Sequence, residues 1–234
     1  MAQKNDPHVE QPVVTVAMNL QHITGRIERY RRQHGILGTL GFLASRIVRH
    51  QRYLVFEASL TTPRSCTEWR AGERLQLFGP ENIDFEMTPQ LQDFLGGEQA
   101  LEHLAGVRNG DRLFVVSSGS ELHHCGYILF QTRQTRILGE TGNPPLIASC
   151  LTAPSARGRG LYRRALNAEL CYLRSQGYER AVIETDPENV ASRKGIEAAG
   201  FQLCREANVW IVLNWMVYQK MAESGGVKRR LLFL

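Results

Sequence analysis

One segment of the chain, residues 151–162, has the residue types and spacing of a phosphate-binding turn. It reads LTAPSARGRGLY and lies between a predicted strand and a long predicted helix. Gly158 and Gly160 let the backbone turn tightly and approach a ligand closely. The first N–H groups of the following helix have no partners within it and lie at its positive end, where anions bind. The simpler alternative, a strand-to-helix turn with its arginines in water, stays open.

A second polar segment, residues 184–192, follows the next predicted strand and favours a bound ligand over a plain turn. Asn189 stands just before a short predicted helix, and Ser192 lies in its first turn. Gly200 ends that helix and Phe201 begins another strand. This second segment, about 30 residues after the first, shifts the interpretation of residues 151–162 from a plain turn toward a ligand site.

The elements that must position these segments are predicted from apolar periodicity and from turn residues. Strands are predicted at residues 53–60, 75–78, 112–117, 125–132, 146–152, 181–185, 201–204 and 209–218. Helices are predicted at residues 36–48, 90–95, 98–104, 160–176 and 189–199. Three successive strands between residues 112 and 152 indicate an antiparallel meander. Helix 160–176 ends at Gly177, the residue type expected after a helix.

These motifs resemble those of the GNAT superfamily of acyl-CoA-dependent N-acyltransferases. Its signature, Arg/Gln-x-x-Gly-x-Gly/Ala, is matched by Arg157, Gly160 and, imperfectly, Tyr162, after the usual Pro-x-x-Arg-Gly at residues 154–158. The later pattern, Asn-x-x-Ser/Ala followed by Gly-Phe, is matched at residues 189–192 and 200–201. The resemblance covers residues 75–218.

The resemblance implies an α/β (α+β) fold, with a mixed, mostly antiparallel sheet of six or seven strands flanked by helices. The sheet would open into a V between strands 146–152 and 181–185, and CoA would lie in the opening without a metal. The strand around Leu151 would also polarise the thioester carbonyl. The residues implied to bind the cofactor are Leu151, Thr152, Arg157, Gly158, Arg159, Gly160, Leu161, Tyr162, Asn189 and Ser192.

The activity implied is transfer of an acetyl group from acetyl-CoA to a primary amine of a small molecule, by direct attack on the thioester. Glu184 is the first candidate for the general base, ahead of Asp186, His123 and His124. Both histidines are expected in an exposed turn. Many family members have a tyrosine where this chain has Ile196, so the acid that protonates the leaving thiolate is unassigned.

Two other functions remain open. Ile196 favours a non-catalytic CoA-binding or interaction module. A transferase of the same fold could instead use an aminoacyl-tRNA or an acyl-carrier donor, which the basic N-terminal segment would bind.

Cys150 is predicted to be a buried structural thiol rather than a nucleophile. A metal site at His123, His124 and Cys125 is not favoured, because no second ligand pair accompanies them.

The amino-acid composition limits the classes of protein to which the chain can belong. The chain has 234 residues, 43% hydrophobic, a mean hydropathy of −0.27 and a formal charge of +5. These values exclude a disordered or collagen-like chain and favour an anionic partner. Five scattered cysteines without a CxxC pair indicate neither a disulfide framework nor a zinc ribbon. We expect a cytoplasmic protein, because this cysteine pattern suits a reducing cytosol. Neither a signal peptide nor an 18-residue apolar stretch supports secretion or membrane spanning.

The predicted domain organisation has four parts. Residues 1–19 form a flexible tail, residues 20–72 a basic helical leader with the first strand, residues 73–220 the GNAT-like domain, and residues 221–234 a C-terminal tail. Residues 20–52 carry seven arginines against the single acid Glu28. The amphipathic helix 36–48 is expected to dock on the domain, with a membrane surface or a homodimer contact as alternatives. Nucleic acid is not favoured, because no reading module is recognisable.

Overall fold

The computed structural model of the protein describes residues 35, 47–66, 68–83, 88–130, 132–213 and 216–233. The chain divides into two compact units, residues 1–49 and 50–234, and the second carries the fold described below. The tail at residues 1–19 and nearly all of the predicted helix 36–48 lie outside the described residues, as do the membrane and homodimer contacts expected of that helix. Among the described helices, none is long and apolar enough to cross a membrane.

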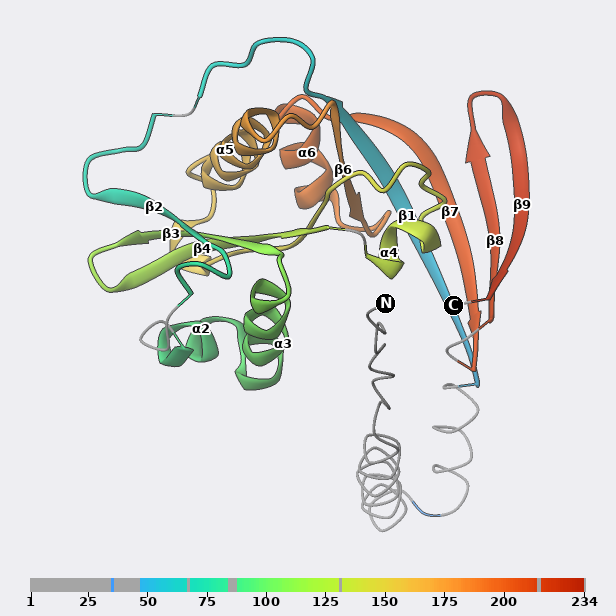
Figure 1. The fold of residues 1–234 in the computed structure, drawn as a ribbon, viewed down its shortest axis with the longest axis horizontal. Coiled ribbons are helices and arrows are strands. Elements are labelled where there is room, and N and C mark those ends of the chain that lie inside the picture. Colours follow the sequence, from blue (N-terminus) through green and yellow to red (C-terminus); the bar gives the residue numbers. More distant parts are fainter. Residues whose placement is uncertain are drawn as a thin grey trace, which may run out of the picture. The chain divides into compact units, whose positions relative to one another are not determined.

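The described residues form one nine-stranded sheet with the order β2-β3-β4-β5-β6-β1-β7-β8-β9 (Figure 1). The strands are β1 (Val48–Ser59), β2 (Glu73–Phe78), β3 (Arg112–Ser118), β4 (Glu121–Leu129), β5 (Leu146–Thr152), β6 (Arg180–Thr185), β7 (Gln202–Val212), β8 (Met216–Glu223) and β9 (Gly226–Phe233). Strands β2 to β5 form an antiparallel meander, as the sequence predicts. The mixed, mostly antiparallel sheet is confirmed.

Helices cover both faces of the meander. They are α2 (Thr88–Leu95), α3 (Gly97–Arg108), α4 (Arg133–Ile137), the 3-10 turn η1 (Pro154–Ala156), α5 (Leu161–Ser175) and α6 (Val190–Ala198). Figure 1 shows α5 and α6 on one side of strands β2 to β4, and α2 and α3 on the other. The predicted apolar stripe of α5 is buried, including Leu166, Leu170 and Leu173, and it packs on Phe114 and Ile183 of the sheet.

The sheet opens between β5 and β6, its parallel pair. Leu146 pairs with Val182 and Ile147 with Ile183, and the described residues beyond these show no further pairing between the two strands. Strand β5 also contains an irregularity against β4, where Ser149 has a φ of 50°. This bulge bends β5 as it leaves β6, and the remainder of β5 presents an unpaired edge to the opening. The predicted V is therefore present.

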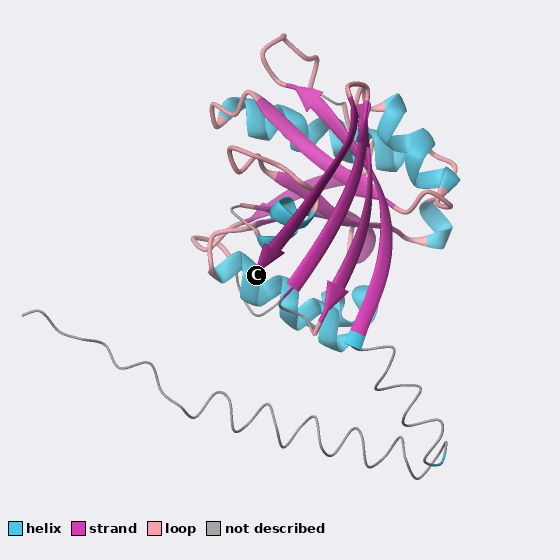
Figure 2. Ribbon diagram, turned by 90° about the vertical axis from the view of Figure 1, so that its right-hand side faces the viewer, coloured by secondary structure: helices cyan, strands magenta, loops and turns pink. Residues whose placement is uncertain are grey.

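The strand count exceeds the six or seven that the resemblance implies. The predicted strand 209–218 spans the end of β7 and the start of β8, which pair antiparallel, and the predicted strand 201–204 is the beginning of β7. The predicted tail, residues 221–234, holds the end of β8 and all of β9, so it extends the sheet. In β8, Val217, Gln219 and Met221 are buried in alternation, which is the pattern of a strand with one covered face. Figure 2 shows these C-terminal strands side by side.

The first strand also differs from its predicted bounds. It begins at Val48 rather than at residue 53, so the last residue of the predicted helix 36–48 belongs to a strand. It lies between β6 and β7, two strands that α6 connects, and pairs antiparallel with β6 from Leu54 to Ser59. A strand from the predicted leader is thus part of the central sheet.

Candidate functional site

A cavity of about 710 Å³ opens where β5 separates from β6, at the N-terminus of α5 and beside α6. Every predicted CoA-binding residue except Arg159 lines it: Leu151, Thr152, Arg157, Gly158, Gly160, Leu161, Tyr162, Asn189 and Ser192. The structure therefore brings the two polar segments of the sequence to one cavity. Arg159 lies apart from the lining, and its carbonyl oxygen accepts a bond of 3.4 Å from Arg70.

The end of the cavity at α5 has the features of an anion site. Gly158 and Gly160 have φ values of 73° and 69°, which strain any residue with a Cβ atom. Among the described helices, α4 and α6 have a side chain that caps their N-termini, whereas Gly160 offers none to α5. The first N–H groups of α5 thus remain available to a ligand, beside the cationic lining side chains of Arg157, Arg163 and Lys194.

Tyr162 stands at the last motif position and bridges α5 to α6. Its ring lies against Gly195, where an added Cβ would be 2.3 Å from the Tyr162 Cδ1 atom. Its hydroxyl lies 3.3 Å from the Ser192 Oγ atom. Burial raises the pKa of Tyr162 above its ordinary value, so the phenol stays protonated at neutral pH. Ile196 lies one turn after Ser192 along α6. It is fully buried in the core and has no proton to donate.

Asn189 has a structural task in addition to lining the cavity. Its Oδ1 atom accepts a bond of 3.0 Å from the backbone N–H of Ser192 and so caps α6. Capping of this kind stabilises a helix by roughly 1 kcal/mol. The spacing of Asn189 and Ser192 in the sequence is therefore explained in part by the start of α6.

Glu184 lines a second cavity, of about 420 Å³, together with Asp186 and Glu188. The two cavities adjoin along the chain, because Glu188 lines the second and Asn189 the first. Burial, with a smaller contribution from the negative charge of Asp186, raises the pKa of Glu184 to about 7, although a long bond of 3.4 Å from Gln134 opposes the shift. A carboxyl group with this pKa can accept a proton near neutral pH.

The two histidines lie in strand β4 and not in an exposed turn, so that prediction was wrong. His124 is fully buried and shares a bond of 2.8 Å with the Thr152 hydroxyl of β5. Burial lowers its pKa to about 3, so its ring is neutral. The His123 ring lies 3.7 Å from the Glu121 carboxylate. Neither histidine lines either cavity.

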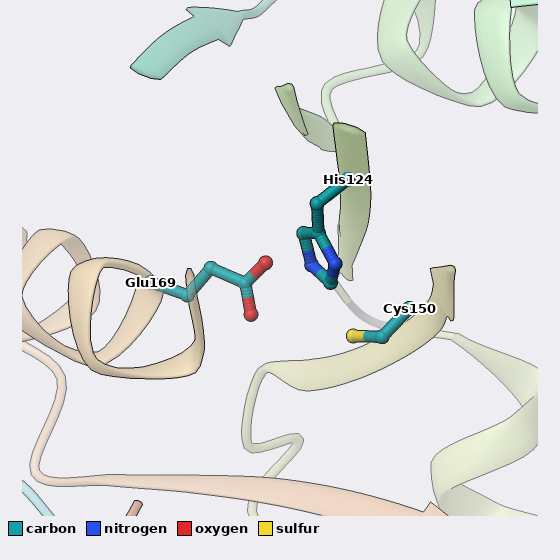
Figure 3. Close-up of side chains that lie close together, drawn as sticks. All are labelled: His124, Cys150 and Glu169. Carbon is teal, nitrogen blue, oxygen red and sulfur yellow. The ribbon is translucent and has the colours of Figure 1, made fainter. Parts of the chain in front are cut away.

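Sequence reasoning missed one cluster of side chains, formed by His124, Cys150 and Glu169 (Figure 3). One potential ligand atom of each lies within 4.8 Å of the others. Burial raises the pKa of Glu169 to about 8 and that of the Cys150 thiol well above its usual value. The available signal was Glu169 itself, a carboxyl group within the buried stripe of α5.

Comparison with solved structures shows what fold this is. An acetyltransferase of the GNAT family from Colwellia psychrerythraea matches with a TM-score of 0.51 and 17% identity, over 70% of this chain and 56% of that one. A tandem GNAT protein from the clavulanic acid biosynthesis pathway matches with a TM-score of 0.52 and 16% identity, over 74% and 57% of the two chains. The chain thus spans a little over half the length of these structures.

Comparison of sequences gives the family. No curated protein sequence matches the chain. The family model described as "Acetyltransferase (GNAT) family" matches residues 77–201, which is more than half of the chain. This range contains both polar segments and the cavity that they line. The chain therefore belongs to the acetyltransferase (GNAT) family.

Proposed function

We propose that the protein transfers an acetyl group from acetyl-CoA to a primary amine of a small molecule. The observation that carries this proposal is the 710 Å³ cavity at the parting of β5 and β6, with the uncapped N-terminus of α5 at one end. A donor that carries a charged diphosphate suits the volume of this cavity and the cationic residues that line it. The first N–H groups of α5 and three cationic lining residues supply the matching positive potential.

The unpaired edge of β5 supports the donor role of this cavity. Residues 148–152 of β5 face the opening without a partner from β6, so their backbone groups can bond an extended amide-containing arm. The backbone N–H near Leu151 would donate to the thioester oxygen as negative charge develops there. A donor held in place before the reaction stabilises that charge without reorganisation.

The second cavity supports the acceptor role. It carries three carboxyl groups, Glu184, Asp186 and Glu188, which favour a cationic amine. Its arginine, Arg52, is paired with Glu206 at 3.0 Å. The bound ammonium group would first lose one proton to water, which gives the neutral nucleophile, and Glu184 would take a second proton as the N–C bond forms and the C–S bond breaks. Tyr162, whose hydroxyl faces Ser192 between α5 and α6, would protonate the leaving thiolate in place of a residue at position 196.

Two measurements test the proposal. Acetyl-CoA should raise the melting temperature of the protein, and free thiol should appear when a panel of primary amines is added. Arg157→Ala should weaken binding of acetyl-CoA, whereas Arg159→Ala is the matched control, because Arg157 lines the cavity and Arg159 does not. The absence of any shift with acetyl-CoA and longer acyl-CoA molecules would overturn the proposal.

A second candidate function, CoA binding without catalysis, is favoured by one observation: Ile196 is buried and cannot donate a proton. Under that function acetyl-CoA raises the melting temperature, but no amine releases free thiol. Tyr162→Phe separates the two, because it keeps the ring on Gly195 and removes the hydroxyl. A turnover that falls about tenfold or more in this variant supports catalysis with Tyr162 as the acid.

The third candidate, an aminoacyl-tRNA or acyl-carrier donor, stays a prediction, because the leader that would bind the carrier lies mostly outside the described residues. Thiol release from acetyl-CoA at a useful rate would count against it.

A further inference from the structure

We propose that His124, Cys150 and Glu169 bind a Zn²⁺ ion at the wall of the larger cavity. The three residues come from β4, β5 and α5, and Figure 3 shows their imidazole, thiol and carboxyl groups pointing toward one shared space. Cys150 also belongs to the β5 edge that the acetyl-transfer proposal uses, through its backbone, whereas the side chains of His124 and Glu169 take no part in that proposal. The metal site is therefore tested by metal binding, which is measured without any acetyl transfer.

The spacing of the ligand atoms fits a metal site. They lie within 4.8 Å of one another. Zn²⁺ holds nitrogen, sulfur and oxygen ligands at about 2.0–2.3 Å in a tetrahedral arrangement, which places ligand atoms roughly 3.5 Å apart. Small side-chain rotations would therefore bring the three groups onto one ion.

The ligand atoms of His124 and Glu169 also lack other partners within the described residues, whereas the Cys150 thiol donates a long bond of 3.7 Å to the Ala148 carbonyl oxygen. His124 and Glu169 are both 0% exposed, and within the described part of the chain His124 Nε2 and both Glu169 carboxyl oxygens have no hydrogen-bond partner. A buried polar atom without a partner costs about 1–3 kcal/mol, and more when the group is charged. A metal ion would satisfy the unpartnered atoms of His124 and Glu169 and bind the Cys150 sulfur at the same time.

Two neighbouring contacts orient the ligands. The hydrogen bond between His124 Nδ1 and the Thr152 hydroxyl, at 2.8 Å, lets Nδ1 carry the ring proton and leaves the Nε2 lone pair facing the cluster. Metal-binding histidines are usually held in this way. A Cβ atom at Gly126 would lie 1.9 Å from the Glu169 Oε1 atom, so a glycine there is needed for the carboxyl group to occupy its place.

The chemistry of the set selects the ion. A thiolate and a carboxylate bring two negative charges, which balance a divalent cation beside a neutral imidazole in surroundings that include the buried Leu166 and Leu170. Thiolate and imidazole are soft or borderline ligands, which favour Zn²⁺ over Mg²⁺ or Ca²⁺. Three protein ligands leave a fourth position, and Cys150 borders the cavity. The ion would thus be accessible from the cavity.

The test is metal binding by the full chain without a histidine tag. After treatment with a chelator, the protein is titrated with Zn²⁺ against a chromophoric chelator, and with Co²⁺ while its absorption spectrum is recorded. We expect equimolar binding and, with Co²⁺, the intense near-ultraviolet absorption that a thiolate ligand produces. Failure to bind Zn²⁺ at micromolar concentration, or a Co²⁺ spectrum without the thiolate absorption, would overturn the proposal.

Variants locate the ion. Cys150→Ala and Glu169→Gln should each weaken Zn²⁺ binding at least about 100-fold, and Thr152→Val, which removes the bond to His124, about 10- to 100-fold. Cys204→Ala is the matched control, because this partly buried thiol of β7 lies outside the cluster and its bond of 3.1 Å goes to the Val55 carbonyl. Unchanged affinity in Cys150→Ala, or equal loss in Cys204→Ala, contradicts the site. If a variant does not fold, the Co²⁺ spectrum of the wild-type protein decides.

Discussion

Two buried glutamates, Glu140 and Glu169, show opposite ways of placing a carboxyl group inside this protein. Glu140 is 9% exposed and accepts bonds from Arg180 at 2.8 Å and Arg205 at 2.6 Å. Glu169 is 0% exposed and has no partner within the described residues. The first carboxylate joins the loop after α4 to β6 and β7, whereas the second faces a histidine and a cysteine.

The presence or absence of partners separates a buried carboxyl group with a structural role from one with a chemical role. A buried charge that is paired on both oxygens connects elements, and removing it leaves its partners unpaired. A buried carboxyl group without partners contributes no such connection, so another ligand is needed to explain its place. Glu184 lies between these extremes, with a single long bond from Gln134 and a pKa raised to about 7.

The largest effect is expected at Glu184. Glu184→Gln should lower the rate of thiol release by about 10²- to 10⁴-fold at neutral pH, because the amide cannot accept the proton of the amine. The steady-state rate with a saturating amine is the measurement, and circular dichroism checks the fold. Glu188→Gln removes another carboxylate from the same cavity and measures the loss of charge alone, so it should lower the rate less than Glu184→Gln. An active Glu184→Gln variant would remove Glu184 from the mechanism.

Glu140→Gln should lower the free energy of unfolding by about 3–5 kcal/mol, because Arg180 and Arg205 lose the carboxylate that they share. Urea denaturation measures this change. The exposed pair of Arg52 and Glu206 supplies the comparison, and Glu206→Gln should cost less than about 1 kcal/mol. Equal decreases in the free energy of unfolding in the two variants would show that burial does not determine how much each ion pair stabilises the protein.

Glu169→Leu should change the free energy of unfolding in the opposite direction. In the presence of a chelator it should raise the free energy of unfolding by about 1–3 kcal/mol, because an unpartnered buried carboxyl group is replaced by an apolar one. Added Zn²⁺ should then stabilise the wild-type protein but not the variant. A variant less stable than the wild type in chelator would mean that the carboxyl group has a structural partner.

The smallest effect is a pH dependence. Because burial raises the pKa of Glu184 to about 7, the base is protonated and inactive below that value. The ratio kcat/KM should fall about tenfold per pH unit below pH 7 and level off above it. The amine has its own titration, so the profile is recorded with two amines of different pKa. A break near pH 7 that moves with the amine would assign the titration to the substrate rather than to Glu184.

Local signals explain how much of the fold was predictable. Helix α5 carries its apolar stripe and lies between Gly160 and Gly177, and α6 lies between Asn189 and Gly200. These patterns depend on residues within a few positions of one another, so they can be read without knowing the fold. The histidines of β4 were wrongly predicted in a turn and the residues of β9 in a tail. A polar or basic segment of a sheet lacks the apolar periodicity from which a strand is predicted.

By itself, the sequence determined the two polar segments, the elements that carry them and the family that they indicate. Only the tertiary structure decided that β1 lies between β6 and β7, that Glu184 lines a different cavity from Tyr162, and that His124, Cys150 and Glu169 converge. The reason is physical. Helix and turn propensities act between neighbours in the chain, whereas strand order and the bulge at Ser149 decide which distant side chains meet.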